Sequence, residues 1–427
     1  MAMTYLLPAG QFDRRDDPAT GRKVVVAGTY HAVPQAPVTP FQAAVAIPKG
    51  MAVAAPVIFL VFLIGGAFGV VDQTGALRRG VSWMAHRLEH RELLVIPIVC
   101  LAFGTAGTLD NMHEEIIPLV PVLLLLTTRL GFDHVVAAAV SVGAAGVGSA
   151  FSPINPFQVG IAQKLAGLPL LSGSGFRLVF LPLALALWIA GVSRYARATR
   201  TPPLREIDEE ARPLDIRDGL VLITILLTFT IFIVGVMRYG WDFDQMSALF
   251  FIMGVIVGLI GRLGLNRTAD AFMEGFRSMA FAAMLIGFAR AIYVVAEQGH
   301  IIDTIVNSLF APLSHFPVGV AAGGMMVAQF LVHFPVPSVT SHAVLTLPVL
   351  VPLSDLLGLP RQVTVLIYQY GGGLCDIVAP TNGGTMAILA AAKIPYGKWI
   401  RFLAPIYGGL FLLGLVAVGI AILIRLS

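Results

Sequence analysis

The sequence predicts an all-α polytopic membrane protein, built as an inverted repeat with two re-entrant helical hairpins and two broken transmembrane helices. Hydrophobic residues make up 57% of the 427 residues and charged residues only 12%, whereas a soluble domain carries roughly 25% charge. Two long apolar runs are interrupted by proline, asparagine and glycine, in "GSAFSPINPFQVG" (148–160) and "DIVAPTNGGTM" (376–386). Two other apolar regions, 92–128 and 317–353, each surround a polar centre.

Uninterrupted spans are expected wherever an apolar run approaches the length that crosses a bilayer, about 20 residues. They lie at 51–71, 176–194, 218–237, 245–261, 278–297 and 401–426. The arginine-rich segments 78–91, 194–217 and 262–277 are expected in the cytoplasm, where short basic loops gather. The loops 238–244 and 297–303 then face outward. This topology explains the formal net charge of +4 without a nucleic-acid partner.

The regions 92–128 and 317–353 are interpreted as re-entrant hairpins. Each arm has about 13–17 residues, which is short for a full crossing. The alternative is a pair of ordinary short helices with a buried polar corner.

The spans 135–166 and 361–395 are expected to be broken near their centres, because proline removes a backbone donor and clashes with the preceding turn. In hydrocarbon such backbone is tolerated only where it lines a cavity or is packed in protein. The N-terminal end of a half-helix suits a carboxylate, and the C-terminal carbonyls suit a cation. The candidate binding residues at the breaks are Ser152, Pro153, Asn155, Asp376, Thr381, Asn382, Gly383 and Thr385.

The two halves of the chain repeat weakly. "SPIN" (152–155) matches "APTN" (379–382), and "VVDQTG" (70–75) resembles "VVAEQG" (294–299). Each broken span follows a hairpin, and with 194–217 inside, corresponding segments cross in opposite directions. Such inverted repeats build secondary transporters. The expected division is a first repeat over 1–200, a cytoplasmic linker over 201–217 and a second repeat over 218–427.

The polar hairpin tips supply further candidate residues. The first tip carries Thr108, Asn111, Glu114 and Glu115, and charges inside a membrane usually face a cavity or a partner. It is expected to bind a cation, a proton or a cationic substrate. The alternative, weighed most for Asp110 and His113, is a solvated tip at the cytoplasmic surface.

The second tip carries Ser338, Thr340, Ser341 and His342. Its hydroxyls can bind carboxylate oxygens, or Ser338 or Ser341 can simply cap the following helix. Arg290, within a span, is expected either to clamp a substrate carboxylate, to pair with a tip glutamate, or to form a structural ion pair between domains.

No motif in the sequence predicts a cofactor or a metal site. "HEE" at 113–115 is not the H-E-x-x-H of metalloproteases, and Cys100 and Cys375 both lie in apolar runs. An enzyme would need a nucleophile with its base, for which Asp376, His342 and Ser341 are the available set. A channel would need a continuous polar pore, whereas the polar residues gather at separate breaks. The expectation is a protein that is neither, with Na⁺ or H⁺ as its coupling ion.

Several longer stretches resemble the YfcC-type membrane proteins, which are basic amino acid antiporters of the C4-dicarboxylate anaerobic carrier group in the ion transporter superfamily. They include "LLPAGQFDRRDDPATGRKVVVAGTYHAV", "GGAFGVVDQTGAL", "GFARAIYVVAEQGHIIDT" and "APTNGGTMAILAAAKIPYGKW". That family has an apolar helix before "LLPAGQF", and this chain begins "MAMTYLLPAG", which matches only its tail.

The resemblance implies a scaffold domain that makes a homodimer contact and a mobile transport domain. The transport domain would hold both hairpins and both broken spans. In related sodium–dicarboxylate symporters, Ser-Asn-Thr tips bind substrate and ion. Here the tips read "TLDN" and "PSVTSH", so that motif is not literally present.

The expected function is secondary active transport by alternating access in the bacterial inner membrane. The solute would be small and carry a carboxylate, as in antiport of a basic amino acid. The alternative is a sodium- or proton-coupled carrier of a C4-dicarboxylate or another organic acid. The expected partners are this solute, membrane lipid and a second copy of the chain, with no nucleic acid.

Overall fold

The computed structural model describes residues 1–17, 22–80, 92–109, 114–201, 215–239, 241 and 243–426. It is mostly helical, as the composition predicts. Within this described part, seven helices are long and apolar enough to cross a membrane. The expected spans therefore appear as helices, and the chain has the make-up of a multi-pass membrane protein.

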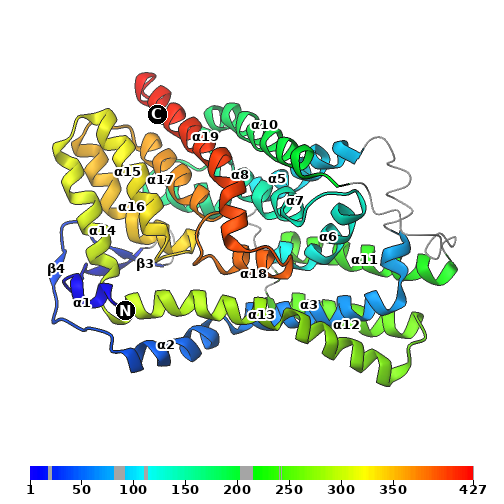
Figure 1. The fold of residues 1–427 in the computed structure, drawn as a ribbon. Coiled ribbons are helices and arrows are strands. Elements are labelled where there is room, and N and C mark those ends of the chain that lie inside the picture. The colour runs from blue at the N-terminus through cyan, green and yellow to red at the C-terminus, as the bar shows by residue number, and fades with distance from the viewer. Residues whose placement is uncertain are drawn as a thin grey trace.

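One group of helices runs along the lower part of Figure 1 and encloses the smaller of two hydrophobic cores. Its members are α3 (Ala55–Thr74), α11 (Ile216–Tyr239), α12 (Phe243–Ile260) and α13 (Gly264–Gln298). Helix α2 (Pro40–Val53) packs on α13 outside this core. Side chains such as Leu60, Phe250 and Phe272 fill this core. Helix α13 has 35 residues, about 52 Å at the usual rise. The segment 262–277, expected as a loop, is therefore helical from Gly264, because α13 continues along α3 beyond its apolar stretch.

The remaining helices pack around the larger core. Its first half holds α5 (Val95–Leu109), α6 (Val120–Arg129), α7 (His134–Ala138), α8 (Ala144–Ala150), α9 (Ile161–Leu165) and α10 (Ser174–Thr199). Its second half holds α14 (Ile302–Phe310), α15 (Val318–His333), α16 (Val339–Leu356), α17 (Arg361–Cys375), α18 (Gly383–Ala391) and α19 (Tyr396–Leu423). Helices α10 and α19, expected in the scaffold, share this core with the broken segments.

The interruptions lie where the sequence predicts them. The first broken span is α7, a π-helical turn at Ala139–Gly143, α8, a non-helical stretch at 151–155, a second π-helical turn at Pro156–Gly160, and α9. The second is α17 and α18, separated by 376–382. The arms of the two predicted hairpins are α5 with α6 and α15 with α16. Their re-entrant course and the inverted repeat stay predictions.

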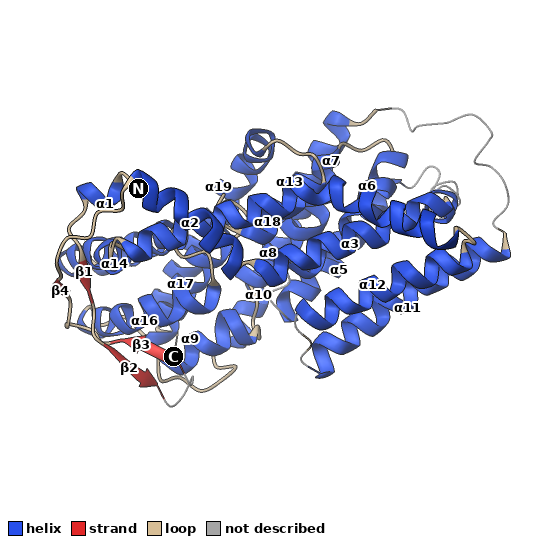
Figure 2. Ribbon diagram, turned by 90° about the horizontal axis from the view of Figure 1, so that it is seen from below, coloured by secondary structure: helices blue, strands red, loops and turns tan. Residues whose placement is uncertain are grey.

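The N-terminal segment contains short strands that an all-α prediction missed. Strand β1 (Gly10–Gln11) pairs with β4 (His31–Ala32), and β2 (Arg14–Asp17) pairs with β3 (Arg22–Val25), both antiparallel. They lie at one end of the molecule beside α14 and α16 (Figure 2). The buried Asp303 of α14 accepts the Phe12 N–H at 2.9 Å and pairs with Arg14 at 2.9 Å. These contacts with a distant helix stabilise strands too short to be read from local pattern.

The arginine-rich segments meet at one end of the described structure. Arg79 pairs with Asp218 at the start of α11, and Arg200 pairs with Glu92 at 3.2 Å. Gly261 packs against Thr74, which ends α3. This common end is consistent with the expected cytoplasmic placement of 78–91, 194–217 and 262–277. Most of the predicted linker 201–217 lies outside the described residues, and Ile216 and Arg217 begin α11.

Close packing of α5 on α8 depends on glycine. A Cβ at Gly148 would overlap the carbonyl oxygen of Gly104, and a Cβ at Gly107 would overlap that of Ala145. We expect Gly148→Ala to force the two helices apart and to lower the free energy of unfolding by about 1–3 kcal/mol, the usual cost of overpacking. Thermal unfolding of the purified protein measures this.

The matched control is Gly408→Ala in α19, where an added Cβ would meet no atom within 4 Å. It should leave stability unchanged or raise it slightly, since alanine favours helix. Equal effects of the two substitutions would contradict the packing argument.

Candidate functional site

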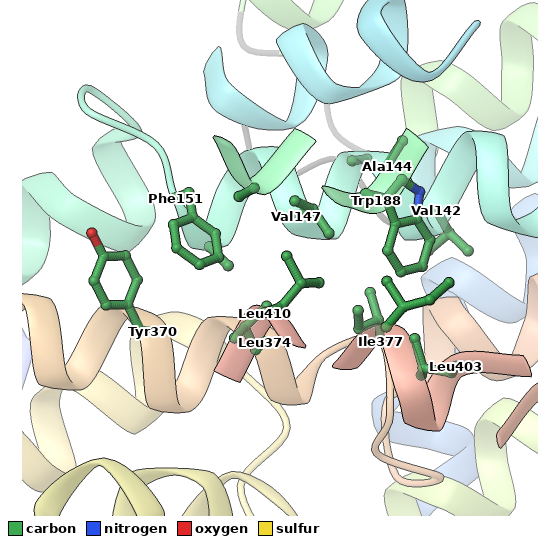
Figure 3. Close-up of a cluster of buried hydrophobic side chains, with 14 of the residues drawn as sticks. Val142, Ala144, Val147, Phe151, Trp188, Tyr370, Leu374, Ile377, Leu403 and Leu410 are labelled. Carbon is green, nitrogen blue, oxygen red and sulfur yellow. The ribbon is translucent and has the colours of Figure 1, made fainter. Parts of the chain in front are cut away.

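The two helix breaks lie side by side in the larger core. Figure 3 shows side chains of α8 facing those of α17 and α19, with Trp188 of α10 beside them. Phe151, the first residue of one break, stacks on Tyr370 of α17 with ring centroids 4.6 Å apart. Trp188 donates to the carbonyl of Ala139 at 3.0 Å, within the π-helical turn before α8. Segments far apart in sequence thus bring both breaks to one place.

The first break is held by two buried side chains. Ser152 Oγ accepts two backbone N–H groups at 2.8 and 3.1 Å and donates to the carbonyl of Thr108 at 2.7 Å. Asn155 Oδ1 accepts two N–H groups of the next turn at 2.9 and 3.0 Å, while its Nδ2 donates to the carbonyl of Gly107 at 3.0 Å. The break is therefore docked on the end of α5, the first hairpin arm. Thr108 Oγ1 adds a bond to the Gly148 carbonyl at 3.2 Å.

The second break has a matching asparagine. Asn382 Oδ1 accepts the Thr385 N–H at 2.9 Å, as a helix cap does. Its Nδ2 donates to Asp376 Oδ1 at 2.8 Å, and Thr385 Oγ1 donates to the Asp376 carbonyl at 2.9 Å. The hydroxyl of Thr381 is buried and has no hydrogen-bond partner among the described residues. It is a polar group left available inside the break.

A network that sequence reasoning missed joins the first break to α17, the helix that leads into the second break. Gln369 Nε2 donates to the Ser152 carbonyl at 2.7 Å, and Gln158 Nε2 donates to the Gln369 carbonyl at 3.2 Å. The guanidinium of Arg177 donates to Gln369 Oε1 at 2.9 Å and to Gln362 Oε1 at 3.1 Å. Arg177 and Gln369 are both 0% exposed. The available signal was their position as polar residues inside apolar runs.

The second hairpin tip reaches the second break through a residue that the sequence analysis did not select. Ser338 caps α16, with the Ser341 N–H directed at its hydroxyl. His342, one turn into α16, lies with its Nδ1 3.0 Å from Nδ1 of His333, and His333 Nε2 lies 2.7 Å from Asp376 Oδ1. The expected residues His342 and Asp376 thus belong to one cluster, and His333 connects them.

A cavity of about 440 Å³ borders the same hairpin tip. Ser341 lines it, together with residues of the N-terminal strands, the end of α13 and the start of α14. Its charged lining carries both signs, from Arg14, Lys23, Glu297 and Asp303.

Other predicted site residues are placed differently. Arg290 is half-buried on α13 with its guanidinium 4.8 Å from the centre of the Tyr293 ring, and the described residues give it no ion pair. Thr340 is half-buried beside Ser341. Asp110, Asn111 and His113 lie outside the described residues, as do the side chains of Glu114 and Glu115. The expected pairing of Arg290 with a tip glutamate is therefore untested.

The described residues hold no group of three or more His, Cys, Asp and Glu side chains placed to bind a metal ion. Cys100 and Cys375 are buried free thiols. What the site offers is hydrogen-bonding groups at two adjacent breaks and the start of helix α18 at the second.

Gln369 is predicted to stabilise the first break and its contact with α17. Gln369→Ala removes the acceptor of the Arg177 Nε–H group and the donor to the Ser152 carbonyl, and a buried group without a partner costs about 1–3 kcal/mol. We expect a clear loss of thermal stability relative to Gln73→Ala, a substitution of an exposed glutamine on α3. Indistinguishable melting of the two variants would show that the network does not hold the first break against α17.

The chain matches known proteins along nearly its whole length. The model of the family described as "C4-dicarboxylate anaerobic carrier" matches residues 3–423. A protein of Escherichia coli named "Putative basic amino acid antiporter YfcC" is 34% identical over 386 residues, 85% of this chain and 76% of that protein. An uncharacterized protein of Haemophilus influenzae is 30% identical over 410 residues, 92% of this chain and 80% of that protein.

Two solved transporter structures resemble the chain more loosely. The YdaH transporter of Alcanivorax borkumensis has a TM-score of 0.44 and 16% identity, covering 99% of this chain and 95% of its own. MtrF of Neisseria gonorrhoeae has a TM-score of 0.43 and 15% identity, covering 96% and 90%. Scores this low leave the family match and the sequence relatives as the basis of assignment. The polytopic helical fold, the paired helix breaks and this match along the chain together make the protein a member of the C4-dicarboxylate anaerobic carrier family.

Proposed function

We propose that this carrier is a secondary active transporter that moves a small carboxylate-bearing solute across the bacterial inner membrane by alternating access. We propose further that the solute is a basic amino acid, exchanged for a related one. The observation that carries the proposal is the pair of adjacent helix breaks, each with an asparagine that bonds the turn after it. Broken helices of this kind form solute and ion sites in secondary transporters.

The second break supplies groups suited to a carboxylate. The first N–H groups of α18, on Gly383 and Gly384, have no acceptor within the helix, and a helix start favours negative charge. The unpartnered hydroxyl of Thr381 precedes them. Glycine at these positions leaves the backbone open to close approach by a solute.

We propose that Arg290 assists at this end. A Cβ at Gly383 would lie 3.1 Å from the side chain of Ile286 on α13. Arg290 follows Ile286 by four residues, so it lies on the same face of α13, one turn along. We propose that its guanidinium forms a paired, two-bond contact with the solute carboxylate.

The cationic end of the solute is assigned to the first hairpin tip. The backbone of Glu114–Leu119 contacts α18, so this tip lies next to the second break. We propose that Glu114 and Glu115 bind the positive side chain of a basic amino acid. The name of the Escherichia coli relative favours this choice.

A second candidate is a C4-dicarboxylate, or another organic acid, driven by sodium or protons. The family description favours it. Two adjacent breaks could hold the two carboxylates of one molecule, with each asparagine-bonded turn near one end.

Thermal stabilisation of the purified protein distinguishes these solutes, because a ligand that binds only the folded state raises its melting temperature. We expect arginine, ornithine or lysine to stabilise the protein, and Glu114→Gln to abolish the effect. Succinate, fumarate and acetate, each with and without sodium at two pH values, complete the set. A shift with dicarboxylates alone would move the assignment to the second candidate.

Thr381→Val tests the carboxylate site without disturbing the fold. The hydroxyl has no partner to lose, so stability should hold or rise. A lost hydrogen bond to a charged group is worth about 1.5–3 kcal/mol, which weakens solute binding at least about tenfold. Titration of the thermal shift with solute measures this.

Thr364→Val is the matched control. Thr364 is also buried with an unpartnered hydroxyl, but it lies in the first turn of α17, three turns from the break. Equal solute affinity of Thr381→Val and Thr364→Val would remove Thr381 from the site.

A further inference from the structure

A hydrogen-bonded chain of three titratable side chains is buried beside the second helix break. It runs from Asp376 through His333 to His342, with links of 2.7 and 3.0 Å. The three residues are 2%, 0% and 1% exposed. They come from the end of α17, the end of α15 and the first turns of α16. Histidine and aspartate chains inside a membrane are typical of proton pathways.

We propose that Asp376, His333 and His342 form a proton-binding site whose loading is coupled to solute binding at the second break, a coupling that rests on the proposed function above. The ion that drives or accompanies transport is then H⁺.

The geometry allows only a few proton arrangements, because each link holds one proton. When Asp376 is ionised, His333 donates to it from Nε2. A neutral His333 must then accept at Nδ1, so His342 donates from Nδ1. His342 Nε2 is left with a lone pair, and this atom is buried without a partner among the described residues. The hydrogen-bonded series of side chains therefore ends at His342 Nε2, a nitrogen that can accept a proton.

Loading adds one proton at His342 Nε2. The proton on His342 Nδ1 passes to His333 Nδ1, and the proton on His333 Nε2 passes to Asp376. Each transfer breaks one N–H bond and forms one N–H or O–H bond, so the net change is one added proton. All three side chains remain hydrogen-bonded before and after.

Loading also removes a buried charge. The unloaded cluster carries one negative charge from Asp376, and the loaded cluster carries none. A charge in a low-dielectric interior is costly. The hydrogen bond from Asn382 to Asp376 compensates for part of that cost in the unloaded state, as charge-assisted bonds do.

Titratable groups also lie on the neighbouring elements. Tyr368 of α17 faces His342 with ring centroids 5.4 Å apart and donates to the Val339 carbonyl at 2.8 Å. Cys375 Sγ lies 3.5 Å from the Phe330 carbonyl. On the α14 side, Arg14 and Asp303 pair with each other. On the α19 side, Tyr407 packs on Phe330, and its buried hydroxyl has no hydrogen-bond partner among the described residues. None of these bonds occupies His342 Nε2.

Asn382 connects the proton to the solute. Its Nδ2 donates to the same Asp376 oxygen that faces His333, while its Oδ1 holds the start of α18. A protonated Asp376 is a weaker acceptor than a carboxylate. Proton uptake therefore loosens Asn382 and the helix end at which the solute carboxylate is proposed to bind. Protonation and solute occupancy then change each other's affinity by the same factor.

Gly372 makes room for this cluster. A Cβ at Gly372 would lie 2.8 Å from Cε1 and Nδ1 of the His342 ring. The glycine at this position on α17 allows the two imidazoles to meet, and a larger residue would displace the ring.

The first test is an infrared pH titration of the full chain, without any solute. We expect acidification to produce a carboxylic-acid C=O band that is absent in Asp376→Asn. The band should persist in His315→Gln, a substitution of an exposed histidine outside the cluster. A wild-type spectrum with no Asp376-dependent band, over the pH range in which the protein stays folded, would overturn the proposal.

His333→Gln keeps a donor for Asp376 but cannot relay a proton. If Asp376→Asn does not fold, this variant decides the test. We expect the pH midpoint of the carboxylic-acid band to differ from that of the wild type. An unchanged midpoint would show that His333 does not share the proton.

The second test measures coupling, with arginine and succinate as probes in vesicles that contain the protein. We expect an imposed pH difference to drive net movement of the solute that stabilises the protein. His342→Asn should still be stabilised by the solute but should lose the response to the pH difference. A full response in His342→Asn would overturn the coupling. The infrared result stands even if neither probe binds, so failure of the proposed solute and failure of the proton site are distinguishable.

Discussion

The structure depends on one constraint: hydrocarbon provides no hydrogen-bond partner for a backbone group, so a broken membrane helix must be satisfied by the protein itself. Ser152 and Asn155 do this at the first break, and Asn382 and Thr385 do it at the second. Ser152 and Asn155 also bond to the end of α5, whereas Asn382 and Thr385 bond to Asp376 within the second break. At the first break, the groups that satisfy the backbone are therefore the same groups that dock the break on its surroundings.

Buried polar residues tie the first break to α17, the helix that leads into the second break. Gln369 contacts the first break from α17, and Arg177 of α10 holds the Gln369 side chain in place. Buried polar groups are stable only when each has a partner. A movement of the first break relative to α17 would leave these groups without partners. This gives a physical reason for the first break and α17 to move as one unit.

Groups available for binding remain where buried polar atoms lack a hydrogen-bond partner. The hydroxyl of Thr381 and Nε2 of His342 have no hydrogen-bond partner among the described residues, and the first N–H groups of α18 have no acceptor within the helix. Such groups cost free energy unless a ligand or a proton completes them. They lie at the second break and along the histidine chain next to it, so solute and proton would act on one small region. At the first break, by contrast, the side chains of Ser152 and Asn155 are already hydrogen-bonded to the end of α5.

The sequence by itself determined the membrane class, the spans and the positions of the breaks, because hydropathy, proline and asparagine act locally on the chain. It also pointed to Asn155, Asn382, His342 and Asp376. Only the tertiary structure decided which residues meet, since His333, Gln369 and Arg177 gain their roles from helices distant in sequence. The N-terminal strands were hidden for the same reason: Asp303, nearly three hundred residues away, supplies the contacts that stabilise them. The hydrophobic periodicity of a segment indicates the face of the helix on which a residue lies. The partners of that residue across the core depend on how the helices pack against one another.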